Sequence, residues 1–248
     1  MAAIWEAQIL RATFFPVEST AVSSDWWVDF TGGQPDSESK QPKEAIVVVN
    51  GAFSGRLLSI SSGAGRVDVV YQPLLPSQIQ VSGAARVPTV TMGPAQPLLD
   101  ELCSRIEPLC SRLRSVHRLA LGGVFLKAAG STEQAYEQLK GMLKSLSVDP
   151  HRMRDLVYRV NWPVKDAQDH EINRIGVWSS VLAKVTGFTF GATSASTLSE
   201  DTFVNFEFDI NTAPDAGVQF TSKAIRSELS FLRELLDENL ERGEVLPP

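Results

Sequence analysis

Cysteine and histidine are scarce in this sequence, and their scarcity limits its chemistry. The 248 residues include two cysteines and three histidines, too few for a cysteine–histidine zinc grouping. Cys103 and Cys110 lie in a segment that we predict to be helical, where their separation corresponds to a rise of about 10.5 Å. A disulfide cannot span that distance. We therefore expect two buried structural thiols and a reducing compartment, the cytoplasm.

Long apolar runs and an excess of positive charge are also absent. No run approaches the roughly 20 apolar residues of a membrane-spanning helix, and the first residues lack the charged segment of a signal peptide. The net charge is −6 and the pI is near 5.2, which argues against bulk-charge binding of nucleic acid or membrane. We expect a soluble cytoplasmic protein with neither kind of partner.

Sequence motifs of known catalytic chemistry are missing as well. There is no HExxH zinc motif and no nucleophile elbow. The two glycines of Gly63-Ala-Gly65 suggest a phosphate-binding loop, but no helix with Lys-Ser/Thr follows, and a hairpin turn explains both. A Ser/His/Asp triad stays open, because its members need not be close in sequence. The sequence identifies neither a family nor a cofactor.

The most regular feature that is present is an alternation of apolar and polar residues from Val204 to Asn211. This period of two is typical of a half-buried β-strand. The apolar set is Val204, Phe206, Phe208 and Ile210, and the polar set is Asn205, Glu207, Asp209 and Asn211. We expect the apolar face to lie at the centre of the core of the second half of the chain.

Further strands are predicted on both sides of this stretch. In the first half we expect strands over residues 9–15, 44–49, 53–61 and 66–71. In the second half we expect strands over residues 117–127, 156–162, 187–191 and 203–211. Residues 172–185 fit a helix or a strand, and we favour a strand at their start.

The connections between the strands carry different signals. Asn50-Gly51 is a strong signal for a two-residue hairpin turn, and residues 62–65 form the next turn. Residues 31–43 have the composition of an exposed loop. Residues 25–30 fit either a short strand or one helical turn.

Three helices have clear apolar stripes. The first spans residues 97–115 and should kink or break near Arg105, because Pro108 removes a helical hydrogen bond. The second spans residues 131–146 and begins with a capping box. The third begins at Thr221 or Ser222, and ends at Arg242 before the C-capping Gly243.

Runs of antiparallel strands covered by amphipathic helices indicate an α+β fold, with the helices on one face of a largely antiparallel sheet. We divide the chain into an N-terminal half, 1–115, and a C-terminal half, 116–248, within one compact unit. Each half is a meander closed by an amphipathic helix, so we expect a similar architecture in both, without a residue-level repeat.

The polar face of the alternating strand is the first candidate site. Side chains two residues apart on one strand lie about 7 Å apart, so Glu207 and Asp209 could share a divalent cation or act as an acid and a base. Asn205 and Asn211 are candidate binding residues beside them. The alternative is a solvated sheet face, which the alternation alone explains. We assign no residue to a resident metal.

A loop rich in charged residues, 161–174, is the second candidate site. Loops at strand ends often carry functional residues. His170 is a candidate general base or ligand, and Lys165 is a second catalytic candidate. The alternative is a solvated hairpin connection.

Asn173 and Arg174 close this loop, and we include both as candidate binding residues. If the strands are neighbours, Arg174 could pair with Glu207 or Asp209. Such a pair would make the polar row structural rather than catalytic.

The favoured function is that of a non-enzymatic protein-binding or assembly module in a soluble intracellular complex, with another protein or a second copy as partner. The reasons are the missing catalytic motifs, the aromatic-rich N-terminus and the edges that antiparallel sheets offer to partners. One alternative is a metal-dependent hydrolase, for example of a phosphodiester, using Glu207 and Asp209. Another is a small-ligand carrier.

Overall fold

The structure is a computed structural model that describes residues 4–74, 90–187, 196–214 and 218–246. Its first part contains β1 (Trp5–Pro16), α1 (Ser24–Thr31), β2 (Ser37–Gln41), β3 (Ile46–Phe53), β4 (Arg56–Gly63), β5 (Arg66–Pro73) and α2 (Ala95–Leu113). Its second part contains β6 (Ser115–Ala128), α3 (Thr132–Met142), β7 (Val157–Asn161), β8 (Val164–Lys165), β9 (Glu171–Gly187), β10 (Ser196–Thr212), β11 (Phe220–Thr221) and α4 (Ser222–Arg242).

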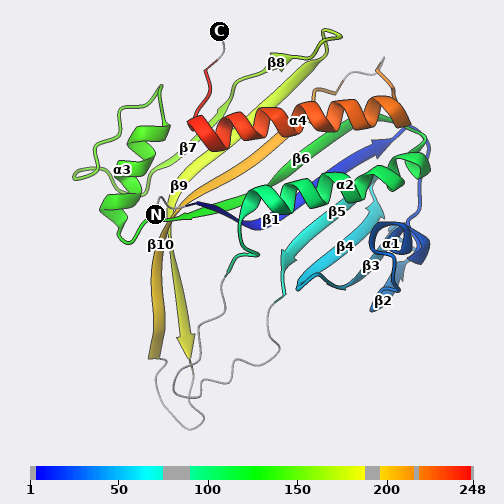
Figure 1. The fold of residues 1–248 in the computed structure, drawn as a ribbon, viewed down its shortest axis with the longest axis horizontal. Coiled ribbons are helices and arrows are strands. Elements are labelled where there is room, and N and C mark those ends of the chain that lie inside the picture. Colours follow the sequence, from blue (N-terminus) through cyan, green and yellow to red (C-terminus); the bar gives the residue numbers. More distant parts are fainter. Residues whose placement is uncertain (1–3, 75–89, 188–195, 215–217, 247–248) are drawn as a thin grey trace.

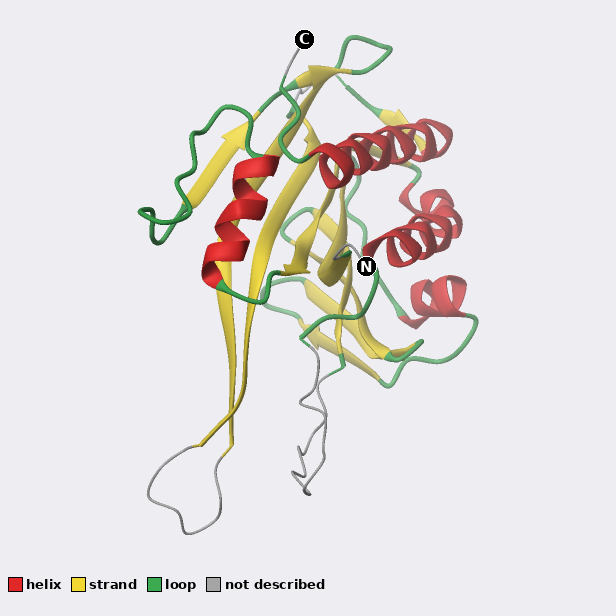
Figure 2. Ribbon diagram, turned by 60° about the vertical axis from the view of Figure 1, so that its left-hand side comes forward, coloured by secondary structure: helices red, strands yellow, loops and turns green. Residues whose placement is uncertain are grey.

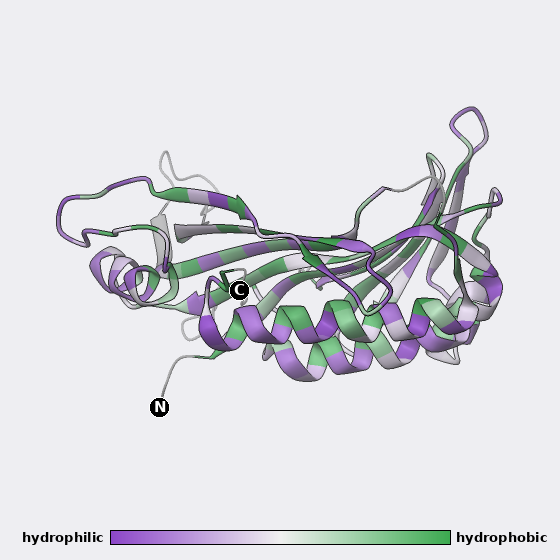
Figure 3. Cartoon of the chain, turned by 90° about the horizontal axis from the view of Figure 1, so that it is seen from above, coloured by the Kyte–Doolittle hydropathy of each residue, from purple (hydrophilic) through white to green (hydrophobic). Residues whose placement is uncertain are grey.

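The described strands form one continuous antiparallel sheet (Figure 1). Its order is β2-β3-β4-β5-β1-β6-β10-β9-β7, with β11 added to β6 and β8 added to β9. Helices α2 and α4 lie side by side on one face of this sheet, and the opposite face carries neither of them (Figure 3). The predicted α+β fold with a largely antiparallel sheet is confirmed.

The pair β1–β6 joins the two parts of the sheet at its centre. Here the backbone of β1 approaches β6 so closely that a Cβ atom on Gly123 would lie 2.3 Å from the carbonyl oxygen of Ile9. On its other side the same Cβ would lie 3.0 Å from the ring of Phe208. Only glycine therefore fits at position 123.

The apolar side chains of β10 occupy the core between the sheet and the helices. Val204, Phe206, Phe208 and Ile210 are all buried, as the alternation predicts. Phe206 stacks on Trp178 of β9 with ring centroids 3.9 Å apart, and Phe208 stacks on Phe125 of β6 at 4.9 Å. Aromatic contacts thus connect the three strands on which the second part depends.

Two predicted connections differ from the structure. Asn50-Gly51 is not a turn but lies within β3, and the hairpin turns at Ser54-Gly55, where both residues have positive φ. Gly51 instead allows a close approach, because a Cβ there would lie 2.8 Å from the backbone nitrogen of Asp36. Residues 31–43, predicted as a loop, contain the edge strand β2, which pairs with β3.

Other segments resolve the alternatives that the sequence leaves open. Residues 25–30 belong to the helix α1, whose Trp26, Trp27 and Phe30 are buried. The ambiguous residues 172–185 are strand throughout, as part of β9. The strand predicted over 187–191 lies almost wholly outside the described residues.

The helices follow the predicted signals with shifted ends. Helix α2 continues through Pro108 without a break. Helix α3 begins as predicted, with the Ser131 hydroxyl accepting a hydrogen bond from the Gln134 backbone, but it ends at Met142. Helix α4 ends at Gly243, which has the positive φ expected of a C-capping glycine.

The two cysteines of α2 are free thiols, as predicted. Cys110 is buried and Cys103 is partly buried. Burial raises the pKa of the Cys103 thiol to about 11, so this sulfur is protonated and unreactive near neutral pH. Among the described residues, no helix is both long enough and apolar enough to cross a membrane.

The order of elements is alike in the two parts. Each begins with a central strand, β1 or β6, continues with a short helix and an antiparallel meander, and ends with a long helix, α2 or α4. This order agrees with the similar architecture that we expect from the sequence for the two halves.

The close contact at Gly123 generates a test of the central pairing. We expect Gly123→Ala to lower the free energy of unfolding by about 1–3 kcal/mol, because the methyl group overlaps the Ile9 carbonyl oxygen and must push β1 away. Urea unfolding measures the change. Gly141→Ala is the control, since a Cβ there meets no atom within 4 Å; the account fails if both substitutions have the same small effect.

Candidate functional site

The polar row of β10 lies on the sheet face opposite to α2 and α4. Asn211 accepts hydrogen bonds from Arg118 at 3.0 Å and from Asn173 at 3.1 Å. Its own amide donates to the Asp209 carboxylate at 3.0 Å. Of the predicted binding residues, Asn173 and Asn211 are thus brought together, directly opposite each other on β9 and β10.

The two remaining members of the row have fewer contacts. Asn205 donates to the Ser179 hydroxyl at 3.1 Å. Glu207 is exposed, and no described residue forms a hydrogen bond or ion pair with its carboxylate. The row therefore joins an ordered amide network at Asp209 and Asn211 to a solvated carboxylate at Glu207.

Arg174 does not reach this row. It is buried on the helix-covered face, where it donates to the Val245 carbonyl at 2.6 Å and pairs with Glu238 at 3.5 Å. Asp237, on the same part of α4, pairs with Arg233. Two of the carboxylates near the C-terminal end of α4 are thus paired with arginines of their own chain.

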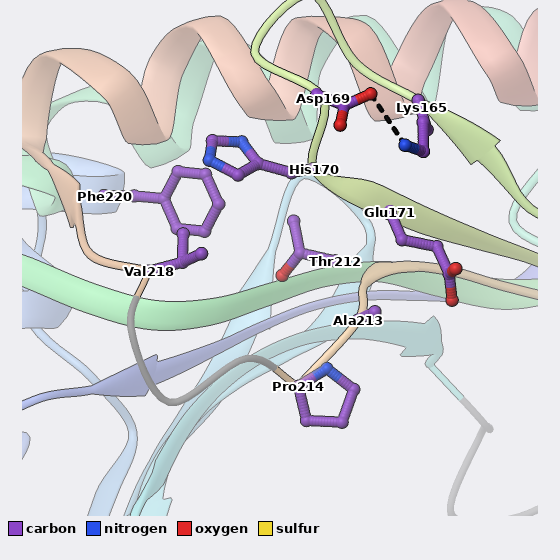
Figure 4. Close-up of a pocket in the computed structure, with 9 residues that line it drawn as sticks. All are labelled: Lys165, Asp169, His170, Glu171, Thr212, Ala213, Pro214, Val218 and Phe220. Carbon is purple, nitrogen blue, oxygen red and sulfur yellow. Dashed lines mark hydrogen bonds and ion pairs between the residues drawn. The ribbon is translucent and has the colours of Figure 1, made fainter.

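Lys165 and His170 lie elsewhere, at a pocket where β9 begins and β10 ends (Figure 4). The pocket has a volume of about 470 Å³. Its walls are formed by Lys165, Asp169, His170, Glu171, Thr212, Ala213, Pro214, Val218 and Phe220. Glu207 and Asp209 do not line it, so the structure separates the four catalytic candidates into two pairs.

His170 is held in the pocket wall by Asp166. Its Nδ1 lies 2.7 Å from Asp166 Oδ2, while Asp166 Oδ1 accepts the backbone N–H groups of Gln168 and His170, both at 2.8 Å. Burial acts to raise the pKa of Asp166, but these hydrogen bonds outweigh it and the pKa is lowered. Because Asp166 is thus an anionic acceptor, we assign the proton to His170 Nδ1.

Behind Asp166 lies a second carboxyl group, Glu228 of α4. Only 5% of Glu228 is exposed, and its Oε1 has no hydrogen-bond partner. Burial, followed by the negative charge of Asp166, raises the pKa of Glu228 to about 7. Asp166 and His170 thus form an acid–base cluster at the pocket, and Glu228 is a buried acid whose pKa responds to the charge of Asp166.

Lys165 takes no part in this cluster. Its ammonium pairs with Asp169 at 2.7 Å, and that hydrogen bond raises the pKa of Lys165. A lysine that stays charged is poorly suited to act as a base or a nucleophile.

Glu228 and Asp166 were not among the residues singled out from the sequence. A signal for Glu228 is nevertheless present, because it follows Ile225 by three residues and so falls on the apolar stripe of α4. A carboxylate in such a stripe must be paired or protonated. Asp166 has no such signal, since its partners come from the folded loop.

A third buried carboxylate, Glu244, has a structural role. Its oxygens accept hydrogen bonds from the backbones of Lys144 and Ser145, and from the side chains of Ser145, Tyr158 and Trp162, at 2.7–2.9 Å. Burial acts to raise its pKa, but the hydrogen bonds outweigh burial and lower the pKa to about 2. Glu244 thereby fixes the end of α4 to β7 and to the segment that follows α3.

Metal binding has little support from these groupings. Among the described residues, no group of three or more His, Cys, Asp or Glu side chains is arranged to hold a metal ion. Glu207 and Asp209 would therefore need ligands from substrate or water.

Comparison with known proteins yields no family. Neither the models of protein families nor the curated proteins include a match to this chain.

The Glu244 contacts generate a prediction for stability and its pH dependence. We expect Glu244→Gln to lower the free energy of unfolding by at least about 2 kcal/mol at neutral pH. The NH₂ group of the glutamine would replace an accepting carboxylate oxygen and would lie against N–H and O–H donors, with which it cannot form hydrogen bonds. Because the pKa of Glu244 is lowered in the folded state, its contribution to the free energy of unfolding is present above pH 4.5. This contribution is lost as the pH falls toward about 2.

Acid unfolding of the two proteins measures this effect. The stability difference between wild type and Glu244→Gln should shrink as the pH falls through that window. Glu241→Gln, at an exposed position of α4, serves as the control. An equal loss in both variants would refute the role assigned to Glu244.

Proposed function

We propose that this chain is a protein-binding or assembly module that accepts an extended strand of its partner along the edge of β9. The observation that carries the proposal is the length of β9. Strand β7 pairs with β9 only as far as Val157, opposite Ser179. Residues 180–187 of β9 continue beyond this point with β10 as their only strand neighbour among the described residues.

These residues belong to a two-stranded arm that projects from the body of the protein (Figures 1 and 2). Apart from the pairing with β10, no backbone hydrogen bond of residues 180–187 is formed with another described residue. Eight residues of strand extend about 26 Å, a length that suits a partner strand. Unpaired strand edges of this kind are the surfaces that β-augmentation uses.

The exposed side chains at the end of β7 and along the arm also favour the β9 edge as the binding surface. Val157 is 68% exposed and Leu182 is 47% exposed, so two apolar side chains lie beside the step between β7 and β9. Natural edge strands are usually protected by charge, proline or bulges. Of residues 180–184, only Lys184 is charged.

Two other strand edges of the described sheet are better protected. Strand β2 is exposed along its length and carries Glu38 and Lys40, which form an ion pair. The β10 side of the arm carries Glu200 and Asp201, and a register shift interrupts its pairing near Thr197. Of these three edges, that of β9 is therefore the most suitable for a partner strand.

A small-ligand carrier is the second candidate, and the pocket at His170 favours it. Its volume of about 470 Å³ falls within the range of about 300–1,000 Å³ that is usual for ligand sites. Native mass spectrometry of the purified chain would support this function by detecting a ligand that His170→Leu releases. The metal-dependent hydrolase has no comparable observation among the described residues.

The edge proposal predicts the effect of a charge on the arm. We expect Leu182→Lys to weaken partner binding about tenfold or more, because the ammonium must be desolvated beside the added strand. The measurement is retention of proteins from a cell extract by the immobilised chain, with light scattering to detect self-association.

Val17→Lys is the matched control, because Val17 is 44% exposed and follows β1 outside the arm. Wild type and Val17→Lys should retain the same proteins, or the same oligomer, and Leu182→Lys should lose them. Equal retention by all three proteins would contradict the proposal.

A further inference from the structure

The walls of the pocket at His170 combine apolar side chains with ionisable ones (Figure 4). The apolar side chains come from the segment between β10 and α4, and they are Ala213, Pro214, Val218 and Phe220. The ionisable side chains come from the end of β8, the loop after it and the first residue of β9, and they are Lys165, Asp169, His170 and Glu171.

We propose that this pocket binds a small organic ammonium ion, whose N–H groups donate to His170 and Glu171 and whose apolar part lies against Phe220 and Val218. The proposal names the class of ligand for the carrier function proposed above, and it rests on that function. It is independent of the partner-binding edge, which is formed by residues 180–187 at the other end of β9.

His170 offers a hydrogen-bond acceptor whose orientation is fixed. Its Nδ1 lies 2.7 Å from Oδ2 of Asp166, whose side chain is only 3% exposed. The other carboxylate oxygen accepts the backbone N–H groups of Gln168 and His170. Because the proton lies on Nδ1, Nε2 carries a lone pair, and no described residue donates a hydrogen bond to it. The imidazole is 30% exposed in the pocket wall, so Nε2 can accept from a ligand.

Glu171 supplies a second acceptor and a negative charge. Its backbone carbonyl accepts the N–H of Ala213 at 2.8 Å, which fixes the start of β9 beside the apolar part of the wall. Its side chain is exposed, and within the described part of the chain no hydrogen bond or ion pair reaches the carboxylate. A carboxylate without a cation is a suitable partner for an ammonium group.

The remaining polar groups of the pocket are already paired. The Lys165 ammonium lies 2.7 Å from the Asp169 carboxylate. The Thr212 hydroxyl accepts from the Leu119 N–H at 3.1 Å and donates to the Leu119 carbonyl at 3.4 Å. The two groups left open are therefore both acceptors. Together with the negative charge of Glu171, they favour a ligand with N–H donors and a positive charge over a carboxylate or a phosphate.

The apolar walls indicate what the rest of the ligand must be. Phe220 is 4% exposed, and its ring meets the His170 ring edge to face with centroids 5.4 Å apart. The volume of about 470 Å³ is many times the roughly 30 Å³ that one water molecule occupies. An organic cation can therefore lay an apolar group against Phe220 and Val218 while its ammonium reaches the two acceptors.

Calorimetric titration of the unmodified protein with three probes tests the ligand class. The probes share one aromatic body and are phenethylamine, phenethyl alcohol and phenylpropionate. Near neutral pH we expect the ammonium probe to bind about fivefold or more tightly than the alcohol, because only the ammonium forms charge-assisted hydrogen bonds with Glu171. The carboxylate probe should bind most weakly, because it would face the Glu171 carboxylate.

Variants of the two acceptors test where the ammonium group lies. We expect His170→Leu to weaken phenethylamine binding about tenfold, because it removes a half-buried acceptor. Glu171→Gln should weaken binding about threefold, because the lost charge is exposed to solvent. Glu207→Gln, at an exposed position outside the pocket, should bind as the wild type does. The comparison of probes needs no variant, so it stays decisive if one of these proteins folds poorly.

Several results would overturn the inference. They are equal affinity for the amine and the alcohol, tighter binding of the carboxylate, no binding of the amine, and unchanged amine binding by both pocket variants. The carrier function has its own test in native mass spectrometry. A ligand that His170→Leu releases and that carries no ammonium group would overturn the ligand class while supporting the carrier function.

Discussion

The close pairing of β1 with β6 is the constraint on which the rest of the structure depends. Where Gly123 lies against the Ile9 carbonyl and the ring of Phe208, the two central strands approach too closely for any side chain. The contact joins the meander of the first part to the strands of the second in one sheet. It also places α2 beside α4 on one face of the sheet.

The features that bear on function arise from this arrangement. Strands β9 and β10 are longer than their neighbours, and so they leave the helix-covered region and end in an arm. The same two strands meet at the other end of β9, where the β8–β9 loop and the residues before α4 enclose the pocket. A single hairpin thus carries both candidate surfaces.

Sequence periodicity predicts the centre of the second part well but its chemistry poorly. The alternation in β10 identifies the buried phenylalanines, because a strand face depends on neighbouring residues alone. The turn predicted at Asn50-Gly51 is wrong because the pairing of β3 with β2, a contact distant in sequence, extends the strand. Likewise, only the folded loop brings the Asp166 carboxylate to His170 Nδ1. Two buried glutamates also show that the sequence does not predict the surroundings of a side chain. Hydrogen-bond donors lower the pKa of Glu244, whereas burial beside Asp166 raises the pKa of Glu228.

Binding of a partner strand at the edge of β9 is the central claim, and photo-crosslinking tests it most directly. A photoreactive residue placed at Leu182 should crosslink to an extended segment of another protein or of a second copy, identified by mass spectrometry. The same residue placed at Glu207, on the polar face of β10, should give no such product. Crosslinks from Glu207 and none from Leu182 would contradict the account.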